Sequence, residues 1–379
     1  MKGARCGRLC IGWRVVKRWG QFMARFMSSV FSSLSRTRKL VAAAGIFACI
    51  GLHPLVAITH PAPRFDQQIR AERVMWPLDA AAGGKVGALT FVEGWSLDAD
   101  YTRFGGFSGL AMMDERRFLL VGDTGLVAEV TIMPDGRVEE PVVMPLPSLP
   151  GSDTSKSERD MEALTGTPDG KQFWIGFEQI HKIYRYGDNL RKLEAQSQPK
   201  ILQALWNNGG IEALARLDDG CFLAIAEVEE RVPARTGLRG VAAYLFNADP
   251  TEQPDHVMPF RYDSEGKGCV TDAQQLPDGR IIILHREVKF PEGFVSTLAI
   301  ADLEGIGPND VMRSKTIARI ARPSIADNFE GLAVVTEPAG RDDSEADDDW
   351  YIWLLSDDNL MGFEQTYLIK YKIDRAQLR

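Results

Sequence analysis

Cysteine is scarce in this 379-residue chain, and three of its five cysteines precede residue 50. The remainder of the chain keeps only Cys221 and Cys269, without a CxxC pair or a Cys/His spacing typical of structural zinc. We expect two free, buried thiols, with a disulfide between them as the alternative. The sequence also lacks a P-loop and a dinucleotide-binding glycine fingerprint.

Basic residues are few in the body of the chain. Residues 1–64 contain 11 Lys and Arg and no acidic residue, which leaves residues 65–379 with 33 basic and 52 acidic side chains, a net charge of −19. Such an acidic body repels phosphate backbones and attracts cations. The charge argues against nucleic-acid binding, and the partner we expect is a small-molecule substrate.

The basic leader, residues 1–64, contains an apolar run at 40–58 directly after Arg36, Arg38 and Lys39. A basic segment followed by an apolar one is typical of secretion signals, and a 19-residue run could also remain in the bilayer as an anchor, although His53 and Pro54 weaken a full span. We expect export to the periplasm or medium, with the protein either cleaved free or held at the inner membrane by residues 40–58. No other membrane contact is predicted.

The most informative feature is a repeat that carries acidic residues at two places. The first acidic position, here called the first mark, lies at the start of a strand. The second acidic position, the second mark, lies at the end of an apolar run about 15 residues later. The first marks are Glu162, Glu212, Asp272 and Glu330, with Ser108 in a fifth copy; the second are Asp123, Glu178, Glu227, Glu287, Asp357 and Asp358. The repeat recurs about every 40 to 60 residues, and several short strands per repeat at such a period predict the blades of a β-propeller.

We therefore predict an all-β chain with a single propeller over residues 86–379, preceded by a linker at 65–85. Five blades are visible, and a sixth would have to lie in 139–160 or 229–262. The fifth repeat lacks a fourth strand, which the strand at 86–97 can supply, so that strands from both ends of the chain close the ring. A closed ring leaves no free sheet edge, which favours a monomer.

Equivalent acids on the innermost strands would meet near the propeller axis. Like charges that close together require a cation or bound protons, and oxygen ligands suit Ca²⁺ first and Mg²⁺ second. The candidate metal ligands are Glu162, Glu212, Glu330 and Asp357. The alternative is structural: each acid accepts backbone N–H bonds from a neighbouring blade and fastens the two together.

Two basic segments lie beside these acids and suggest catalytic roles. His285 and Arg286 precede Glu287, and His181 follows Glu178. We expect Arg286 to bind an oxyanion, His285 to act as general acid, and Glu162, Glu212, Glu330 and Asp272 to complete the catalytic set. The substrate-binding candidates are Asp123, Glu178, Glu227, Glu287 and His181. Both histidines could instead be half-buried strand residues.

The segments FGGFSGLA (104–111), VGDTG (121–125), DMEALT (160–165), GIEALA (210–215) and DNFEGLAV (327–334) resemble the phytase-like propeller family, named for an esterase-like activity of phytase. The resemblance covers residues 86–375. It implies an exported bacterial propeller whose repeated acids form the active region, with Glu162, Glu212 and Glu330 on the strands and Asp123 and Asp357 in the loops. Phytate itself is too anionic to suit a body of charge −19.

Together these features predict an exported hydrolase of ester or phosphoester bonds that uses a metal ion. Two alternatives stay open. One is a non-catalytic propeller that binds an envelope partner or a sugar, and the other is a calcium-dependent lactonase.

Overall fold

The computed structural model describes residues 68–378, except 79, 101–103, 115, 150–158, 206–208, 228–239, 339–347 and 361–363. All of them belong to one compact unit, Pro63–Arg379. The basic leader, with its apolar run, lies outside the described residues. None of the described helices has the length and apolarity that crossing a membrane requires.

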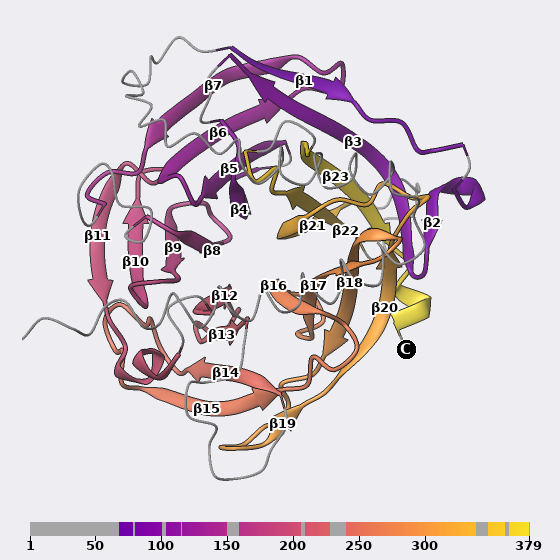
Figure 1. Cartoon of the computed structure of the whole chain (residues 1–379). Helices are drawn as coiled ribbons and strands as arrows, with labels where there is room; N and C mark the ends of the chain where they lie inside the picture. The colour runs from indigo at the N-terminus through magenta and orange to yellow at the C-terminus, as the bar shows by residue number, and fades with distance from the viewer. Residues whose placement is uncertain are drawn as a thin grey trace, which may run out of the picture. The chain divides into compact units, whose positions relative to one another are not determined.

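Five sheets surround a common axis (Figure 1). We number them blades one to five in the chain order of their innermost strands. The innermost strands each contact the next around a closed circle. The prediction of an all-β propeller is confirmed, with five blades in the described residues.

The blades have the following strands. Blade one consists of β4 (Phe107–Met112), β5 (Arg117–Gly122), β6 (Leu126–Ile132) and β7 (Val138–Pro145), and blade two of β8 (Met161–Gly166), β9 (Gln172–Phe177), β10 (Lys182–Gly187) and β11 (Lys192–Ser197). Blade three consists of β12 (Ile211–Arg216), β13 (Phe222–Ala226), β14 (Val241–Phe246) and β15 (Val257–Tyr262), with β19 (Val311–Met312) parallel to β15. Blade four consists of β16 (Cys269–Gln275), β17 (Ile281–Lys289), β18 (Gly293–Ala301) and β20 (Ser314–Ile320).

Blade five closes the ring with strands from both ends of the described chain. It consists of β21 (Phe329–Glu337), β22 (Asp349–Ser356), β23 (Thr366–Ile373) and β3 (Leu89–Ala99), flanked by β1 (Ile69–Arg73) and β2 (Lys85–Val86). β3 pairs antiparallel with β23 from Thr366↔Leu97 to Ile373↔Leu89, as predicted for the strand at 86–97. Residues 69–73, within the expected linker, instead form β1 because they find a free edge on β3. The described residues also contain three short 3₁₀ helices, η1 (Ala82–Gly84), η3 (Lys200–Ala204) and η4 (Arg375–Leu378).

The repeated Asp-Gly turns join the first and second strands of three blades. Gly170, Gly220 and Gly279 have positive φ angles, which glycine adopts at little cost. The N–H of each glycine donates to the carbonyl three residues earlier, at 2.9–3.0 Å. The turn chemistry therefore fixes the register of each hairpin.

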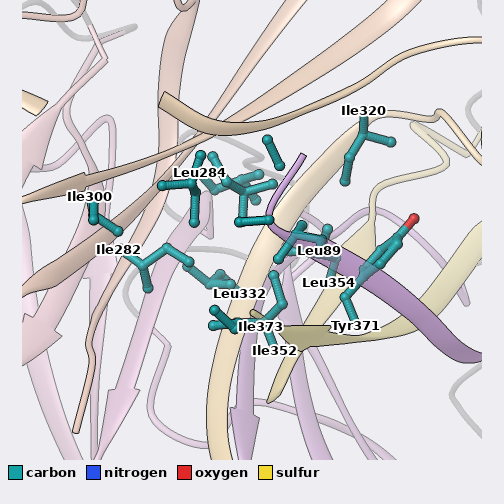
Figure 2. Close-up of a cluster of buried hydrophobic side chains, with 14 of the residues drawn as sticks. Leu89, Ile282, Leu284, Ile300, Ile320, Leu332, Ile352, Leu354, Tyr371 and Ile373 are labelled. Atoms are coloured by element: carbon teal, nitrogen blue, oxygen red, sulfur yellow. The ribbon is translucent and has the colours of Figure 1, made fainter. Parts of the chain in front are cut away.

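The hydrophobic core consists of five clusters, each between two adjacent blades. Between blades four and five, Ile282 and Leu284 of β17 pack with Leu332, Ile352 and Leu354 (Figure 2). The second strand of each blade is buried on both faces, which explains its continuous apolar sequence. This packing holds the innermost strands, and the acids they carry, in fixed positions.

Candidate active and metal-binding site

A β-bulge occurs at the same place on all five innermost strands. In each blade the pairing of the first two strands skips one residue. The skipped residues are Ser108, Glu162, Glu212, Thr271 and Glu330. A bulged residue has no partner across the strand pair and can be directed away from the regular ladder. We call these five residues the inner ring.

Blade four differs from the predicted repeat by one residue. Thr271, not Asp272, is the bulged residue there. Asp272 is buried, and its carboxylate accepts hydrogen bonds from the backbone N–H of Ala273 and of Leu332 in blade five, both at 2.7 Å. Its position matches the structural alternative, in which an acid joins two blades, and not the ring position expected for it.

The second marks of the repeat form an outer ring at the ends of the second strands. The N–H of Asp123, Glu178, Glu227 and Asp357 donates to a carbonyl two residues before the bulge, at 2.9–3.3 Å. In blade four the equivalent residue is Arg286, which pairs with Cys269. The outer ring therefore consists of Asp123, Glu178, Glu227, Arg286 and Asp357. Glu287, predicted in this ring, lies one residue further along β17 and forms an ion pair with Lys289 at 2.5 Å.

Carboxylates gather on the side of blades two and three. Ligand oxygens of Asp160, Glu162 and Glu178 lie within 4.8 Å of one another, and so do those of Glu178, Glu212 and Glu227. Glu178 belongs to both triplets and is only 8% exposed. We call these five residues the acidic cluster.

The pKa values of three carboxyls in the acidic cluster, those of Glu162, Glu178 and Glu212, are raised. Burial, followed by the charges of Glu212, Glu330, Asp160 and Glu178, raises the pKa of Glu162 well above its ordinary value. Burial and the neighbouring carboxylates also raise the pKa of Glu212. The pKa of Glu178 rises to about 7 through burial, Asp160 and Glu227, although the N–H groups of Gly210 and Gly209 oppose the rise.

The side of blades four and five contains its own positive charge. Arg286 Nη1 donates to Glu330 Oε1 at 2.5 Å and to Asn328 Oδ1 at 2.8 Å, and its Nη2 lies 3.8 Å from Glu227 Oε1. Burial would lower the pKa of Arg286, but the carboxylates of Glu330, Glu227 and Glu212 raise it above its ordinary value. Arg286 therefore stays charged between the acidic cluster and blade five.

Arg286 and its hydrogen-bond partners also hold Glu330 in place. Asn328 Nδ2 donates to Glu330 Oε1 at 3.0 Å, and the Ser108 hydroxyl bonds to the same carboxylate. Burial raises the pKa of Glu330, while Arg286, Ser108 and Asn328 limit the rise. Asp357 accepts the N–H of Asn359 at 2.7 Å, and burial followed by the charge of Glu330 raises its pKa to about 8. Ser108 is thus a hydrogen-bond partner within the inner ring.

The two histidines proposed for the site lie in different surroundings. His285 is fully buried; its Nε2 is 2.8 Å from the hydroxyl of Tyr262 and its Nδ1 is 3.0 Å from the carbonyl of Thr297. Burial lowers its pKa to about 4, so it is neutral and lies between blades three and four, surroundings that do not suit the general-acid role expected for it. His181 lies in the turn after β9, where its N–H donates to the Glu178 carbonyl at 3.3 Å.

The remaining loop acid, Asp358, has a structural position. Its carboxylate accepts the N–H groups of Gly106 in blade one and of Leu360, both at 2.9 Å, and the Thr366 hydroxyl at 3.1 Å. It joins the loop after β22 to blade one.

The donor set of the acidic cluster fits a hard divalent cation. It offers only carboxylate oxygens from two adjacent blades, which are the ligands that Ca²⁺ and Mg²⁺ bind. Of the four predicted ligands, Glu162 and Glu212 belong to the cluster. Glu330 and Asp357 lie instead with Arg286 and Asn328.

Comparison with known proteins identifies the family of the chain. The sequence model of the phytase-like family, described as esterase-like activity of phytase, matches residues 102–360. No curated protein matches the chain. Among solved structures, the β-propeller domain of Cps50 (Swd1) from Myceliophteria thermophila is similar, at 10% identity over 74% of this chain and 76% of that one, with a TM-score of 0.35. That likeness is too weak to support an argument. Because the family match spans more than half of the sequence and includes both rings, the chain belongs to the phytase-like (esterase-like activity of phytase) family.

Proposed function

We propose that this protein hydrolyses ester or phosphoester bonds with the help of a divalent cation held by the acidic cluster. The observation that carries the proposal is the position of Glu178, which is buried and shared by two carboxylate triplets. Buried carboxylates at such distances stay ionised together only beside a cation. Calcium is the first candidate and magnesium the second.

The ligands would be Asp160, Glu162, Glu178, Glu212 and Glu227. A divalent cation there would supply a bound water of lowered pKa and polarise the oxygen of the scissile bond. Arg286 would bind the negative charge that develops on the substrate, since its Nη2 is directed toward Glu227 at the edge of the cluster.

Asp357 can take the acid role that His285 cannot fill. Its pKa of about 8 keeps the carboxyl protonated at neutral pH, and the charge of Glu330 contributes to that rise. A protonated carboxyl on the Arg286 side of the rings can donate a proton to the leaving group of a substrate that Arg286 binds. His285, by contrast, is engaged at both ring nitrogens.

The test is turnover of bis-p-nitrophenyl phosphate and p-nitrophenyl acetate with calcium, with magnesium and with EDTA. We expect metal-dependent hydrolysis of one of the two substrates, lowered at least about a hundredfold by Glu178→Gln because the shared ligand is lost. Glu304→Gln, at an exposed loop position, is the matched control and should retain full activity.

Equal turnover in Glu178→Gln and the unsubstituted protein would remove this proposal. Absence of hydrolysis with every metal would favour the non-catalytic propeller, and metal-dependent turnover of lactones alone would favour the lactonase.

Export is a further part of the proposal, supported by the basic leader and the apolar run at 40–58. Fractionation of cells that produce the full chain tests it, and recovery in the cytoplasm alone would contradict it.

A further inference from the structure

In the described residues, the second strand of blade four continues further past the outer ring than the second strands of the other blades. The second strands of the other blades end one residue before the outer ring, at Gly122, Phe177, Ala226 and Ser356. β17 instead continues to Lys289, three residues beyond Arg286, and β18 begins at Gly293. The hairpin therefore extends past the outer ring at the position where Arg286 lies.

The two faces of this extension have different chemistry. Successive residues of a strand point to opposite faces, and directly paired residues share a face. Glu287 and Lys289 form an ion pair at 2.5 Å and so occupy one face. Val288 and its partner Phe294 occupy the other face, the face of Arg286 and its partner Ser296.

Apolar side chains are unusually exposed there. Val288 is 72% exposed and Phe290, at the hairpin tip, is 100% exposed. Phe294, the strand partner of Val288, is half-buried beside them. Exposed apolar side chains on one hairpin indicate a binding surface. We call Val288, Phe290 and Phe294 the apolar rim.

We propose that the apolar rim binds the apolar chain of an amphiphilic ester or phosphoester whose scissile group lies beside Arg286 and the acidic cluster. The inference rests on the proposed function. Its support is continuity: the apolar face starts at Arg286 and, over four residues of extended chain, reaches about 13 Å outward. Arg286 and Val288 share one face of β17, so a ligand whose polar group binds Arg286 can place its apolar chain along the hairpin. One amphiphilic molecule therefore fits this face better than two separate ligands.

The test compares substrates that differ only in chain length, with p-nitrophenyl acetate and p-nitrophenyl octanoate assayed in calcium. In the double variant Val288→Ser/Phe290→Ser we expect the KM for the octanoate to rise at least about tenfold, because burial of the added methylenes is lost, while the acetate KM is unchanged. The control is Met75→Ser/Leu78→Ser, which removes side chains of similar exposure, 74% and 104%, outside the apolar rim. It should leave both KM values unchanged.

A binding measurement separates failure of this inference from failure of the proposed function. Octylphosphonate and methylphosphonate are titrated into each variant by calorimetry in calcium, with no hydrolysis required. We expect tighter binding of octylphosphonate to the unsubstituted chain and to the Met75/Leu78 control, and loss of that preference in the Val288/Phe290 variant.

Three results would overturn the proposal. The first is a chain-length preference that survives in the Val288/Phe290 variant or is absent from the unsubstituted chain. The second is rim-dependent sedimentation with phosphatidylglycerol vesicles without a chain-length preference, which would assign the apolar rim to a lipid surface. The third is rim-dependent dimerisation in sedimentation equilibrium without that preference, which would assign it to a second copy of the chain.

Discussion

A single side chain divides the two rings into different electrostatic environments. Arg286 occupies the outer-ring position that acids occupy in the other four blades, and it contacts Glu330 directly. The carboxylates near Arg286 therefore have a counter-charge in the protein. Glu162, Glu212 and Glu178, whose pKa values are raised by burial and then by neighbouring carboxylates, need a proton or a cation.

Replacing Arg286 tests this division. Arg286→Gln leaves Glu330, whose side chain is 11% exposed, without its ion-pair partner. We expect a loss of about 2 kcal/mol in the free energy of unfolding, measured with urea in EDTA at pH 7.5, because a buried charge loses its compensation. The loss should shrink at pH 5, where Glu330, with its raised pKa, takes up a proton more readily.

Arg319→Gln is the control for that measurement. Its ion pair with Glu292 has 43% of each side chain exposed, and we expect it to contribute less than about 1 kcal/mol. Equal effects of the two substitutions at pH 7.5 would contradict the account of Arg286.

At the scale of strands and hairpins, the sequence predicts the blades and their turns but not the register in blade four. Thr271 and Arg286 are separated by the same 15 residues as Asp272 and Glu287, so the spacing alone cannot distinguish the two assignments. The position of the β-bulge distinguishes the two assignments, because the backbone pairing of β16 with β17 skips Thr271 and not Asp272. Asp160 and Asn328, two residues before the inner ring, could be found from sequence because they precede the repeated Glu at a fixed distance.

The surroundings of His285 fit the alternative of a buried strand residue, for a related reason. His285 immediately precedes an outer-ring residue, but alternation along β17 directs it away from the rings, toward Tyr262 of blade three and the Thr297 carbonyl. Proximity in sequence to a site residue therefore gave no information on side-chain direction.

Strand β3 is the element on which closure depends. A chain that begins at residue 75 lacks β1 but keeps β3, and we expect it to unfold cooperatively with a loss of about 1–3 kcal/mol, in line with removal of one buried side chain, Ile69. A chain that begins at residue 100 also loses the buried Leu89, Trp95 and Leu97 and exposes the edge of β23.

The second chain should lose cooperative unfolding, followed by far-UV circular dichroism in urea, and should aggregate through its open edge. If it unfolds as cooperatively as the first, β3 is not what closes the propeller.

For the whole molecule, the raised carboxyl pKa values couple stability to pH. The pKa values of Asp327, Glu178 and Asp357 are raised to about 6, 7 and 8, chiefly by burial, so the folded chain binds more protons than the unfolded chain between about pH 4 and pH 8. A carboxyl with a raised folded pKa favours folding most at low pH, and that contribution is lost as pH rises.

We therefore expect the Tm of the protein in EDTA to fall as pH rises from 5 to 8, measured by differential scanning calorimetry. Calcium should restore the Tm at pH 8 more than at pH 5, because the cation replaces the protons lost from Glu178 and the other carboxyls of the acidic cluster. A Tm in EDTA that rises steadily from pH 5 to pH 8 would contradict the claim that burial in the folded chain raises the pKa values of these carboxyls.

The central claim is that the acidic cluster of blades two and three binds a divalent cation, and calorimetric titration of the metal-free protein with calcium at pH 8 tests it most directly. The account predicts saturable binding of at least one ion per chain, released protons, and loss of that binding in Glu178→Gln but not in Glu304→Gln. Absence of saturable binding with both calcium and magnesium, or identical binding in Glu178→Gln, would contradict it.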